Sequence, residues 1–458
     1  MLTKTVAERV IGHALCAGGD FAELFYEDTT TANLHWLDGQ LYSAQNGRLH
    51  GAGVRVIRGV LSAYAYTNDT SPQGLMQTAL RAAVALGQAG NNREIILHPK
   101  DFLQSHLIKL PPDTVDMSKK IALLKAASNA AQGNSIRQVS ANWIETAQRV
   151  TIANSAGLFT SDERTRVRFA VTAVAGDEHQ NQTGSQSPGA QMGFEFMDSI
   201  DPGALGRAAA LQAVTMLKAD ECPGGRVPVA IANGFGGVII HEACVHSLEA
   251  TSVAKNASEF CGKLGQTIAA PGVTVIDDGT LPNAWGSANI DDEGRPTQRN
   301  VLIENGVLQS YLVDYLGGLR MGMTPNGCGR RNGYAYAPTS RMSNTFIAPG
   351  AHTDEEIIAS IADGLYAKQM GGGSVSPATG EFNFAVSEGY WIKNGRIDRP
   401  VRGATLIGRG SEVLMNIDYV GRELAFGQGN CGSQSGSVPT NVGQPMIRVR
   451  ELTVGGRG

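Results

Sequence analysis

Glycine is the residue type that most restricts the folds open to this chain. It occupies 57 of the 458 positions, about one in eight, where roughly 7% is usual in proteins. The 18 prolines are unremarkable, so the excess is not that of a low-complexity segment rich in both residues. Because glycine readily adopts the positive φ angles of tight turns, the excess indicates many short connections between strands.

The first half of the chain alternates between helical and extended patterns. Helices are expected near residues 6–17, 72–86, 118–132 and 204–217. The second of them starts at a Ser-Pro pair that can cap it. Residues 21–27, two apolar runs on either side of Arg58-Gly59, and residues 136–196 have the patterns of strands. This half is therefore predicted to be mixed α and β.

A run of helix-breaking residues from Asp220 to Gly225 separates the two halves. It ends the last of these helices and precedes a new apolar strand, Val227 to Ile231. We therefore expect an N-terminal α+β domain over residues 1–222 and a C-terminal domain over residues 223–458. A subdivision of the first domain, if present, falls near residue 105.

The second half is predicted to be mainly β with two helices. Asn305-Gly306 and Asn394-Gly395 each follow an apolar run, and Asn-Gly is the strongest short signal for a hairpin. The helices are expected near residues 238–254 and 354–366. The predicted fold class is thus a two-domain α+β protein, whose mainly β C-terminal domain carries a helix of chemical interest.

Charge and hydropathy disfavour several classes of function. The 38 Lys and Arg residues against 42 Asp and Glu give a net charge of −4, which disfavours direct contact with nucleic acid. The longest apolar stretch, Val227 to Ile240, is too short to span a membrane, and Glu8 and Arg9 interrupt any signal peptide. Six cysteines without a Cys-x-x-Cys pair favour free thiols or isolated metal ligands. We expect a cytoplasmic protein without membrane contact.

The sharpest chemical feature is a cluster of two imidazoles and two carboxylates between His241 and Glu249. It resembles the His-Glu-x-x-His helix of metalloproteases, in which both histidines face one metal and the glutamate acts as base. Here one extra residue separates His241 from His246, which places them about 140° apart on a regular α-helix. Binding of one metal by both therefore predicts a π-type turn or a kink at Cys244-Val245.

A catalytic zinc site needs a third protein ligand and one open position. The spacing of the motif does not decide whether this third ligand is Glu249, Cys244 or a residue from elsewhere in the fold. Glu249 could instead orient an imidazole, because it lies three residues after His246 on nearly the same helix face. Cys431 lies in a polar, glycine-rich segment predicted to be a loop, where a thiol indicates function. The opposing interpretation is a surface or interface helix whose histidines are merely solvated or hydrogen-bonded.

Three other segments have weaker chemical signals. The acidic runs Asp277 to Gly279 and Asp291 to Gly294 lack the spacing of a calcium-binding loop, and we interpret both as hairpin turns. Residues 234–237 lack the lysine and hydroxyl residue of a phosphate-binding loop. Their glycines instead indicate the close approach of another backbone.

The motif and a long series of other segments resemble the TldD/PmbA family, also described as modulators of DNA gyrase, and within it the TldD-like branch that carries the motif. The resemblance covers nearly the whole chain, most sharply its second half. Besides Gly237 to Glu249, the segments that carry it are Val275 to Gly279, Ile290 to Gly294, Asn300 to Gly306, Gly329 to Arg331, Arg341 to Thr345, Gly371 to Gly373, Ala378 to Phe382, Arg402 to Gly408, and Cys431 to Pro445. The chain departs from the family at Val245, where glycine is usual, and at Ala250-Thr251, where Gly-Asp is usual.

The resemblance implies zinc bound by His241, His246 and Cys431, with Glu242 as general base. It also implies a peptidase for unfolded or extended peptides that works as a homodimer, or as a heterodimer with a related subunit lacking the motif. Zinc would lower the pKa of bound water toward ~7, and Glu242 would take the proton. We expect the peptide to add as a strand to a sheet edge, such as one near Gly371 to Phe384. The alternatives are a non-catalytic peptide-binding or gyrase-modulating subunit with a vestigial motif, and a structural protein with a zinc clip.

Overall fold

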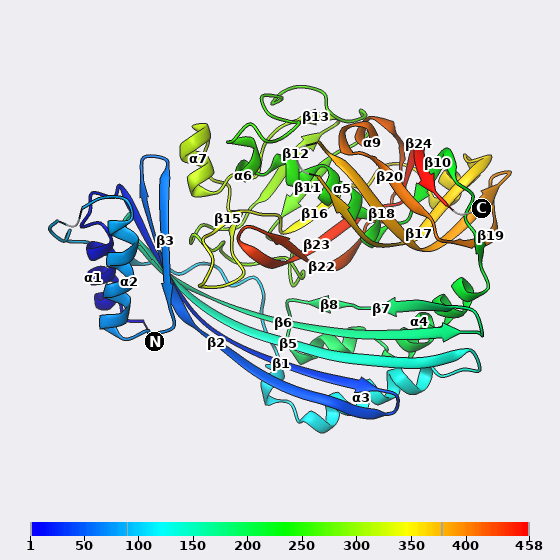
Figure 1. Ribbon diagram of the computed structural model, residues 1–458, viewed down its shortest axis with the longest axis horizontal. Helices are drawn as coiled ribbons and strands as arrows, with labels where there is room; N and C mark the ends of the chain where they lie inside the picture. The colour runs from blue at the N-terminus through cyan, green and yellow to red at the C-terminus, as the bar shows by residue number, and fades with distance from the viewer. Residues whose placement is uncertain (1, 89, 377–378, 457–458) are drawn as a thin grey trace.

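Four long antiparallel strands form one side of the molecule in the computed structural model, which describes residues 2–88, 90–376 and 379–456. They are β1 (Phe21–Leu37), β2 (Gln40–Arg58), β5 (Ile136–Asn154) and β6 (Leu158–Gly176). Their sheet has the order β3-β2-β1-β5-β6-β4, and β7 and β8 also pair with β6. Its shorter strands are β3 (Leu61–Thr67), β4 (His98–Pro99), β7 (Asn181–Gln186) and β8 (Gly189–Ala190). Figure 1 shows the long strands curving beneath the C-terminal part.

Tight turns fix the register of these strands. Asp38 and Gly39, with φ of 45° and 87°, join β1 to β2 in a two-residue turn. The pairing runs from there to Phe21 opposite Ile57. Gly59, with φ of 60°, lies in the predicted turn between β2 and β3. The strands are longer than predicted. The residues at their ends are polar and interrupt the apolar pattern on which the prediction rests, but their backbones still form hydrogen bonds with the neighbouring strand.

The four helices predicted for the first half are present, and they pack on this sheet in two pairs. They are α1 (Lys4–Ala14), α2 (Pro72–Val84), α3 (Met117–Ala130) and α4 (Pro202–Leu217), with short 3-10 helices η1 (Pro112–Thr114) and η2 (Phe194–Ser199). α1 contacts α2 at one end of the sheet, and α3 contacts α4 further along (Figure 1). Each helix begins at a side chain that accepts a hydrogen bond from a backbone amide in its first turn. Trp143 and Phe169 are fully buried in the core under α3 and α4.

The C-terminal part contains two larger sheets. The first has the order β17-β10-β24-β20-β18-β19-β9, with β21 on β24, and β17 also pairs with β18, so that five strands close into a ring. Its strands are β9 (Asp220–Glu221), β10 (Gly225–Ile231), β17 (Asp363–Val375), β18 (Glu381–Lys393), β19 (Arg396–Arg402), β20 (Thr405–Arg409), β21 (Ile417–Val420) and β24 (Ile447–Gly455). The second has the order β13-β12-β11-β16-β23-β22. It comprises β11 (Val275–Asp278), β12 (Arg299–Glu304), β13 (Val307–Leu308), β16 (Asn344–Ile347), β22 (Ala425–Ser433) and β23 (Gly436–Gln444), beside the small pair β14 (Gly329–Arg330) and β15 (Thr339–Ser340).

In the C-terminal part, the predicted turns match the structure more closely than the predicted helices do. Asn305-Gly306 and Asn394-Gly395 all have positive φ and lie in hairpins, as predicted. The helices are short: α5 (Val238–Ala243), α6 (Ala250–Val253), α7 (Tyr315–Met321), α8 (Asp354–Ala359) and α9 (Gly410–Asn416). The helix predicted over residues 354–366 is too long, because strand β17 begins at residue 363. Among the described residues, no helix combines the length and the apolar character needed to cross a membrane.

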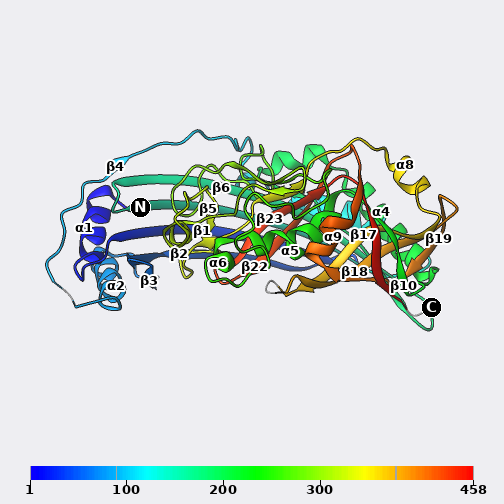
Figure 2. The ribbon, with the colours of Figure 1, turned by 90° about the horizontal axis from the view of Figure 1, so that it is seen from above.

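Buried ion pairs join the N-terminal sheet to the C-terminal part, which Figure 2 shows lying over the long strands. Arg164 of β6 lies 2.6 Å from Asp292, and Arg55 of β2 lies 2.7 Å from Glu293. Residues 291–294 do form a tight turn, but one that is buried in this interface. The other acidic run ends strand β11, so the hairpin-turn interpretation is wrong there.

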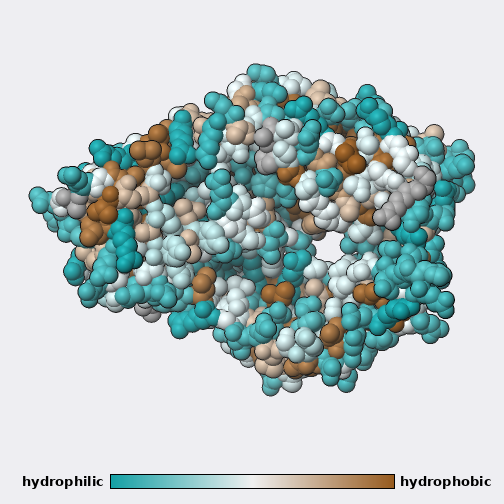
Figure 3. Space-filling view, viewed as in Figure 1, coloured by the Kyte–Doolittle hydropathy of each residue, from teal (hydrophilic) through white to brown (hydrophobic). Residues whose placement is uncertain are grey.

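A cavity of about 620 Å³ lies between α4 and β7 on one side and β17, β18 and β22 on the other. Figure 3 shows the molecule hollowed between its lower and upper parts at this place. The strands β17 and β22 therefore border an open space on the side that faces the long sheet.

Candidate metal centre

The chain enters the site through a glycine-rich turn after β10. The 3-10 helix η3 (Gly234–Gly237) leads directly into α5. A Cβ on Gly237 would lie 2.6 Å from the backbone of Gly443 in β23, and one on Gly236 would lie 2.7 Å from Gln444. The predicted close approach of another backbone is confirmed, and it holds α5 against the sheet that carries β22.

The helix breaks between the two histidines. α5 ends at Ala243, Cys244 has φ −123° and ψ −59°, and the 3-10 helix η4 (Val245–Leu248) follows. The predicted kink is confirmed, but the π-type alternative is wrong, because the chain tightens into a 3-10 turn instead. The helix predicted over residues 238–254 is therefore three short pieces. Val245 does not adopt a positive φ and is fully buried, so this turn does not require glycine.

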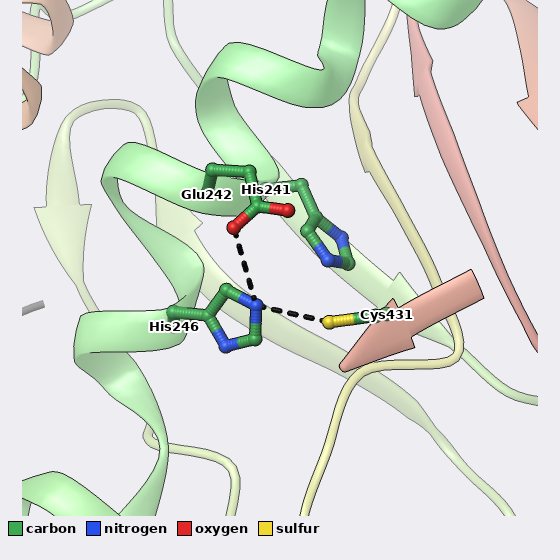
Figure 4. A group of neighbouring side chains, drawn as sticks. All are labelled: His241, Glu242, His246 and Cys431. Atoms are coloured by element: carbon green, nitrogen blue, oxygen red, sulfur yellow. Dashed lines mark hydrogen bonds and ion pairs between the residues drawn. The ribbon is translucent and has the colours of Figure 1, made fainter. Parts of the chain in front are cut away.

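The break brings four predicted site residues together. The rings of His241 and His246 have centroids 5.1 Å apart and planes at 86°. One potential ligand atom from each of His241, Glu242, His246 and Cys431 lies within 4.8 Å of the others. Sγ of Cys431 lies 3.0 Å from Nε2 of His246, and Oε2 of Glu242 lies 3.5 Å from the same nitrogen. Figure 4 shows the four side chains converging from the broken helix and from a strand.

Cys431 reaches the cluster from strand β22, so the prediction of a loop is wrong. It lies opposite Val438 in the antiparallel pair of β22 and β23, and its side chain is buried. The glycines and polar residues around it suggested a loop, but an edge strand tolerates them because one of its sides makes no ladder hydrogen bonds.

Burial controls the protonation of the cluster. Burial lowers the pKa of His241 well below its ordinary value, and the charges of His246 and Arg341 lower it further. The ring is therefore neutral, which is the form of imidazole that binds a metal. Burial raises the pKa of Glu242. For His246, burial acts to lower the pKa, but the carboxylate of Glu249 and the contact with Cys431 together outweigh it, and the pKa is raised well above its ordinary value.

The residues of the cluster fit a metal ion. Two imidazole nitrogens and a thiolate form a donor set that suits zinc. Nδ1 of His241 is buried and has no hydrogen-bond partner among the described residues, so the ring has a nitrogen free for a ligand. Cys244 is not part of the cluster, because its side chain lies in the hydrophobic core, where burial raises the pKa of the thiol.

Two further buried side chains lie beside the cluster and support it. Oε1 of Glu249 lies 3.2 Å from Nδ1 of His246, on the opposite edge of the ring from Cys431. Arg341 is fully buried, donates a hydrogen bond to the carbonyl oxygen of Cys431, and has its Nε 3.9 Å from Oε1 of Glu249. The spacing within the motif indicated Glu249 as an orienting residue. The spacing could not indicate Arg341, because Arg341 and Cys431 lie 90 positions apart in the chain and only the fold brings them together.

A cleft of about 470 Å³ opens beside the cluster. The end of β17, at Ser374 and Val375, forms one wall, and residues 432–434 at the end of β22 form another. In the described part of the chain β22 pairs only with β23, and β17 pairs with β10 only as far as Ala367. Both strands thus have an edge without a partner near the cleft.

Profiles of three domains from one protein family match the chain. The PmbA/TldA metallopeptidase C-terminal domain matches residues 224–456, the central domain matches residues 110–217, and domain 1 matches residues 22–86. The chain belongs to the PmbA/TldD family. The resemblance expected from the sequence motifs is therefore confirmed.

Relatives of this PmbA/TldD protein match it over almost their whole length. A protein named Metalloprotease TldD homolog from Haemophilus influenzae is 35% identical, with 95% of this chain and 93% of the relative covered. A protein named Metalloprotease from Methanothermobacter thermautotrophicus is 34% identical, with 95% and 96% covered. The solved structure of TldE from Thermococcus kodakarensis has a TM-score of 0.79 at 17% identity, covering 98% of this chain and 99% of its own. A Thermotoga maritima structure, described as a proposed modulator of a DNA gyrase, also has a TM-score of 0.79, at 22% identity and with 95% and 96% covered. These two structures show that the fold is shared.

Proposed function

We propose that this PmbA/TldD protein is a zinc-dependent peptidase that hydrolyses unfolded or extended peptides. The observation that carries the proposal is the convergence of two imidazoles, a thiol and a carboxylate beside an open cleft. His241, His246 and Cys431 hold the zinc and leave one position open. Glu242 remains free to act as general base. The relatives named metalloprotease support this assignment.

The residues of the chain divide the chemical work between them. Zinc, when bound, supplies a Lewis acid that activates water and polarises a carbonyl group. The side chain of Glu242 is 28% exposed and lines the cleft, so its carboxylate can reach the attacking water. Because burial raises the pKa of this group, its carboxylate is a stronger base than an exposed glutamate, and it accepts the proton of the water and passes it to the leaving amine. Glu249 holds the ring of His246 in place by charge attraction, with its Oε1 3.2 Å from Nδ1.

The arrangement of β17 and β22 supports an extended substrate. Gln369 and Met370 of β17 and residues 426–428 of β22 line the large cavity between the two parts of the molecule. The later residues of both strands line the metal cleft. A peptide in extended conformation can pair with an open strand edge through its backbone, which gives affinity with little sequence preference. The predicted edge near residues 371–384 includes the end of β17, while residues 377–378 lie outside the described residues.

We further propose that the protein works in the cytoplasm, as a homodimer or as a heterodimer with a related subunit that lacks the motif. The net charge of −4 supports a protein or peptide partner rather than direct nucleic-acid contact. Sedimentation equilibrium of the purified chain gives the mass of the assembly. A mass of one chain at all concentrations contradicts the homodimer, and co-purification with a motif-lacking relative supports the heterodimer.

The replacement Glu242→Gln tests the proposed chemistry. It should reduce cleavage of a reduced and alkylated protein by a factor of about 100 or more, while zinc stays bound. Glu304→Gln, which changes an exposed glutamate of β12, is the matched control and should keep full activity. The same substrate in its folded form should resist cleavage. Zinc-loaded wild type that cleaves neither form would instead favour the non-catalytic binding or gyrase-modulating subunit.

A further inference from the structure

A separate cavity, of about 260 Å³, lies between the long strands and the sheet of β22 and β23. Four arginines line it: Arg164, Arg166, Arg330 and Arg331. Asn430 also lines it, and its neighbour Cys431 belongs to the metal cluster. Because successive side chains of a strand point to opposite faces, this arginine cavity lies on the other face of β22 from the candidate metal centre.

Two of the four guanidinium groups already have carboxylate partners. Arg164 lies 2.9 Å from Asp162 and 2.6 Å from Asp292, and Arg331 pairs with Glu23. The carboxylates that line the cavity are those of Asp292 and Glu27. Both oxygens of Glu27 accept hydrogen bonds, from the side chains of Thr29 and Gln148 and the amide of Tyr334. These acidic groups are therefore engaged by other donors.

Arg166 and Arg330 have no carboxylate within ion-pair distance in the part of the chain that the structure describes. Arg166 donates to the carbonyl oxygens of Trp285 and Ser287 and to the side-chain oxygen of Gln191. Arg330 donates to the carbonyl oxygens of Met342 and Pro439. Among the described residues, Nη1 of Arg166 and Nε of Arg330 have no acceptor, and neither nitrogen is sealed from solvent.

Burying two cations that have no directly paired carboxylate is costly, even though Asp162 and Asp292 attract Arg166, and Asp292 and Asp277 attract Arg330, from a greater distance. Burial lowers the pKa of Arg166 to about 9, and the charge of Arg330 contributes. Burial also lowers the pKa of Arg330 to about 10, against the attraction of Asp292. An anion between the two groups would remove this cost. Guanidinium groups match oxyanions geometrically, and Asn332, Asn430 and Ser437 add neutral donors to the same cavity.

We propose that the arginine cavity binds a small tetrahedral oxyanion, phosphate or sulfate, between Arg166 and Arg330. Arg166 belongs to β6 of the long sheet, and Arg330 belongs to β14 of the C-terminal part. The anion therefore bridges the two parts of the molecule and stabilises their packing. This site is independent of the proposed peptidase activity.

Calorimetric titration of the full-length chain with inorganic phosphate, at constant ionic strength, tests the site. One saturable binding event is expected for phosphate and none for acetate, which separates a tetrahedral oxyanion from a carboxylate. Arg166→Gln and Arg330→Gln should each weaken binding by about tenfold or more. Arg149→Gln, at an exposed arginine of β5, is the control and should leave phosphate binding unchanged. Equal binding of acetate, or binding that disappears in Cys431→Ala, overturns the proposal.

A second measurement uses only the wild type, because both arginines also hold carbonyl groups and either variant could fold poorly. Crystals of the wild-type protein soaked in selenate locate the anion by its anomalous scattering. Selenate density between Arg166 and Arg330 supports the site. Absence of selenate from the arginine cavity, together with no saturable phosphate titration of the wild type, overturns it.

Discussion

Replacing Glu249 by glutamine probes how the candidate metal centre is supported. Its carboxylate lies 3.2 Å from Nδ1 of His246, and its side chain is only 4% exposed, so water cannot easily take its place. Glutamine keeps the shape and an acceptor oxygen but removes the negative charge. The replacement also leaves the buried guanidinium of Arg341, 3.9 Å away, without that counter-charge.

We expect Glu249→Gln to weaken zinc binding by a factor of about 10 to 100, which corresponds to about 1.4–2.8 kcal/mol. The attraction between full charges 3.2 Å apart is about 5 kcal/mol at an effective dielectric constant of ~20. That value is an upper bound, because an imidazole that binds zinc is neutral and glutamine retains a polar oxygen beside the ring. The expected loss is therefore a fraction of the full Coulomb energy.

The zinc affinity is measured by competition with a chromophoric chelator at pH 7. Glu388→Gln is a matched control, because Glu388 is also a buried carboxylate paired with a cation, Lys368 at 2.7 Å, but lies outside the metal cluster. Thermal unfolding of the metal-free variants shows that both are folded. A zinc affinity of Glu249→Gln within about twofold of wild type would refute the supporting role of this carboxylate.

Two further predictions concern stability. Burial raises the pKa of Asp291 to about 7 and of Glu293 to about 8. Both carboxyls therefore contribute fully to stability at pH values below the ordinary pKa of a carboxyl group, and this contribution is lost as the pH rises through the raised pKa values. The free energy of unfolding should therefore fall between about pH 5 and pH 8. In urea titrations at several pH values, Glu293→Gln should make this dependence on pH less steep. An unchanged dependence contradicts the raised pKa of Glu293. Gly237→Ala should lower the free energy of unfolding by about 1–3 kcal/mol, because the new Cβ would lie 2.6 Å from the backbone of Gly443. Gly372→Ala, whose Cβ meets nothing within 4 Å, should leave the calorimetric melting temperature unchanged, and equal melting of both variants would count against the close packing of β23.

The sequence predicts the fold best where local chemistry decides the structure. The Asn394-Gly395 turn and the cap of α2 at Ser71 depend on a few neighbouring residues, and they are found as predicted. Strand lengths and the region around Cys431 are predicted less well, because pairing with a neighbouring strand outweighs the local polar and glycine-rich composition. The broken helix after Ala243 was only half predicted, since spacing indicated a kink but not its 3-10 form.

In the candidate site, too, residues that are close in the sequence could be predicted, whereas residues that only the fold brings together could not. The spacing of His241, Glu242 and His246 was sufficient to propose a metal site, because these residues are close in the chain. Cys431 could be chosen as a ligand only from the family resemblance. Arg341 and the arginine cavity could not be predicted, because their partners come together only through sheet packing.

Zinc content, measured by elemental analysis of protein expressed with ample zinc, tests the central claim most directly. We expect about one zinc per chain in wild type, its loss in Cys431→Ala, and its retention in Cys244→Ala, which alters a core thiol next to the motif but outside the cluster. Metal-free wild type, or zinc that persists in Cys431→Ala, would contradict the proposed centre.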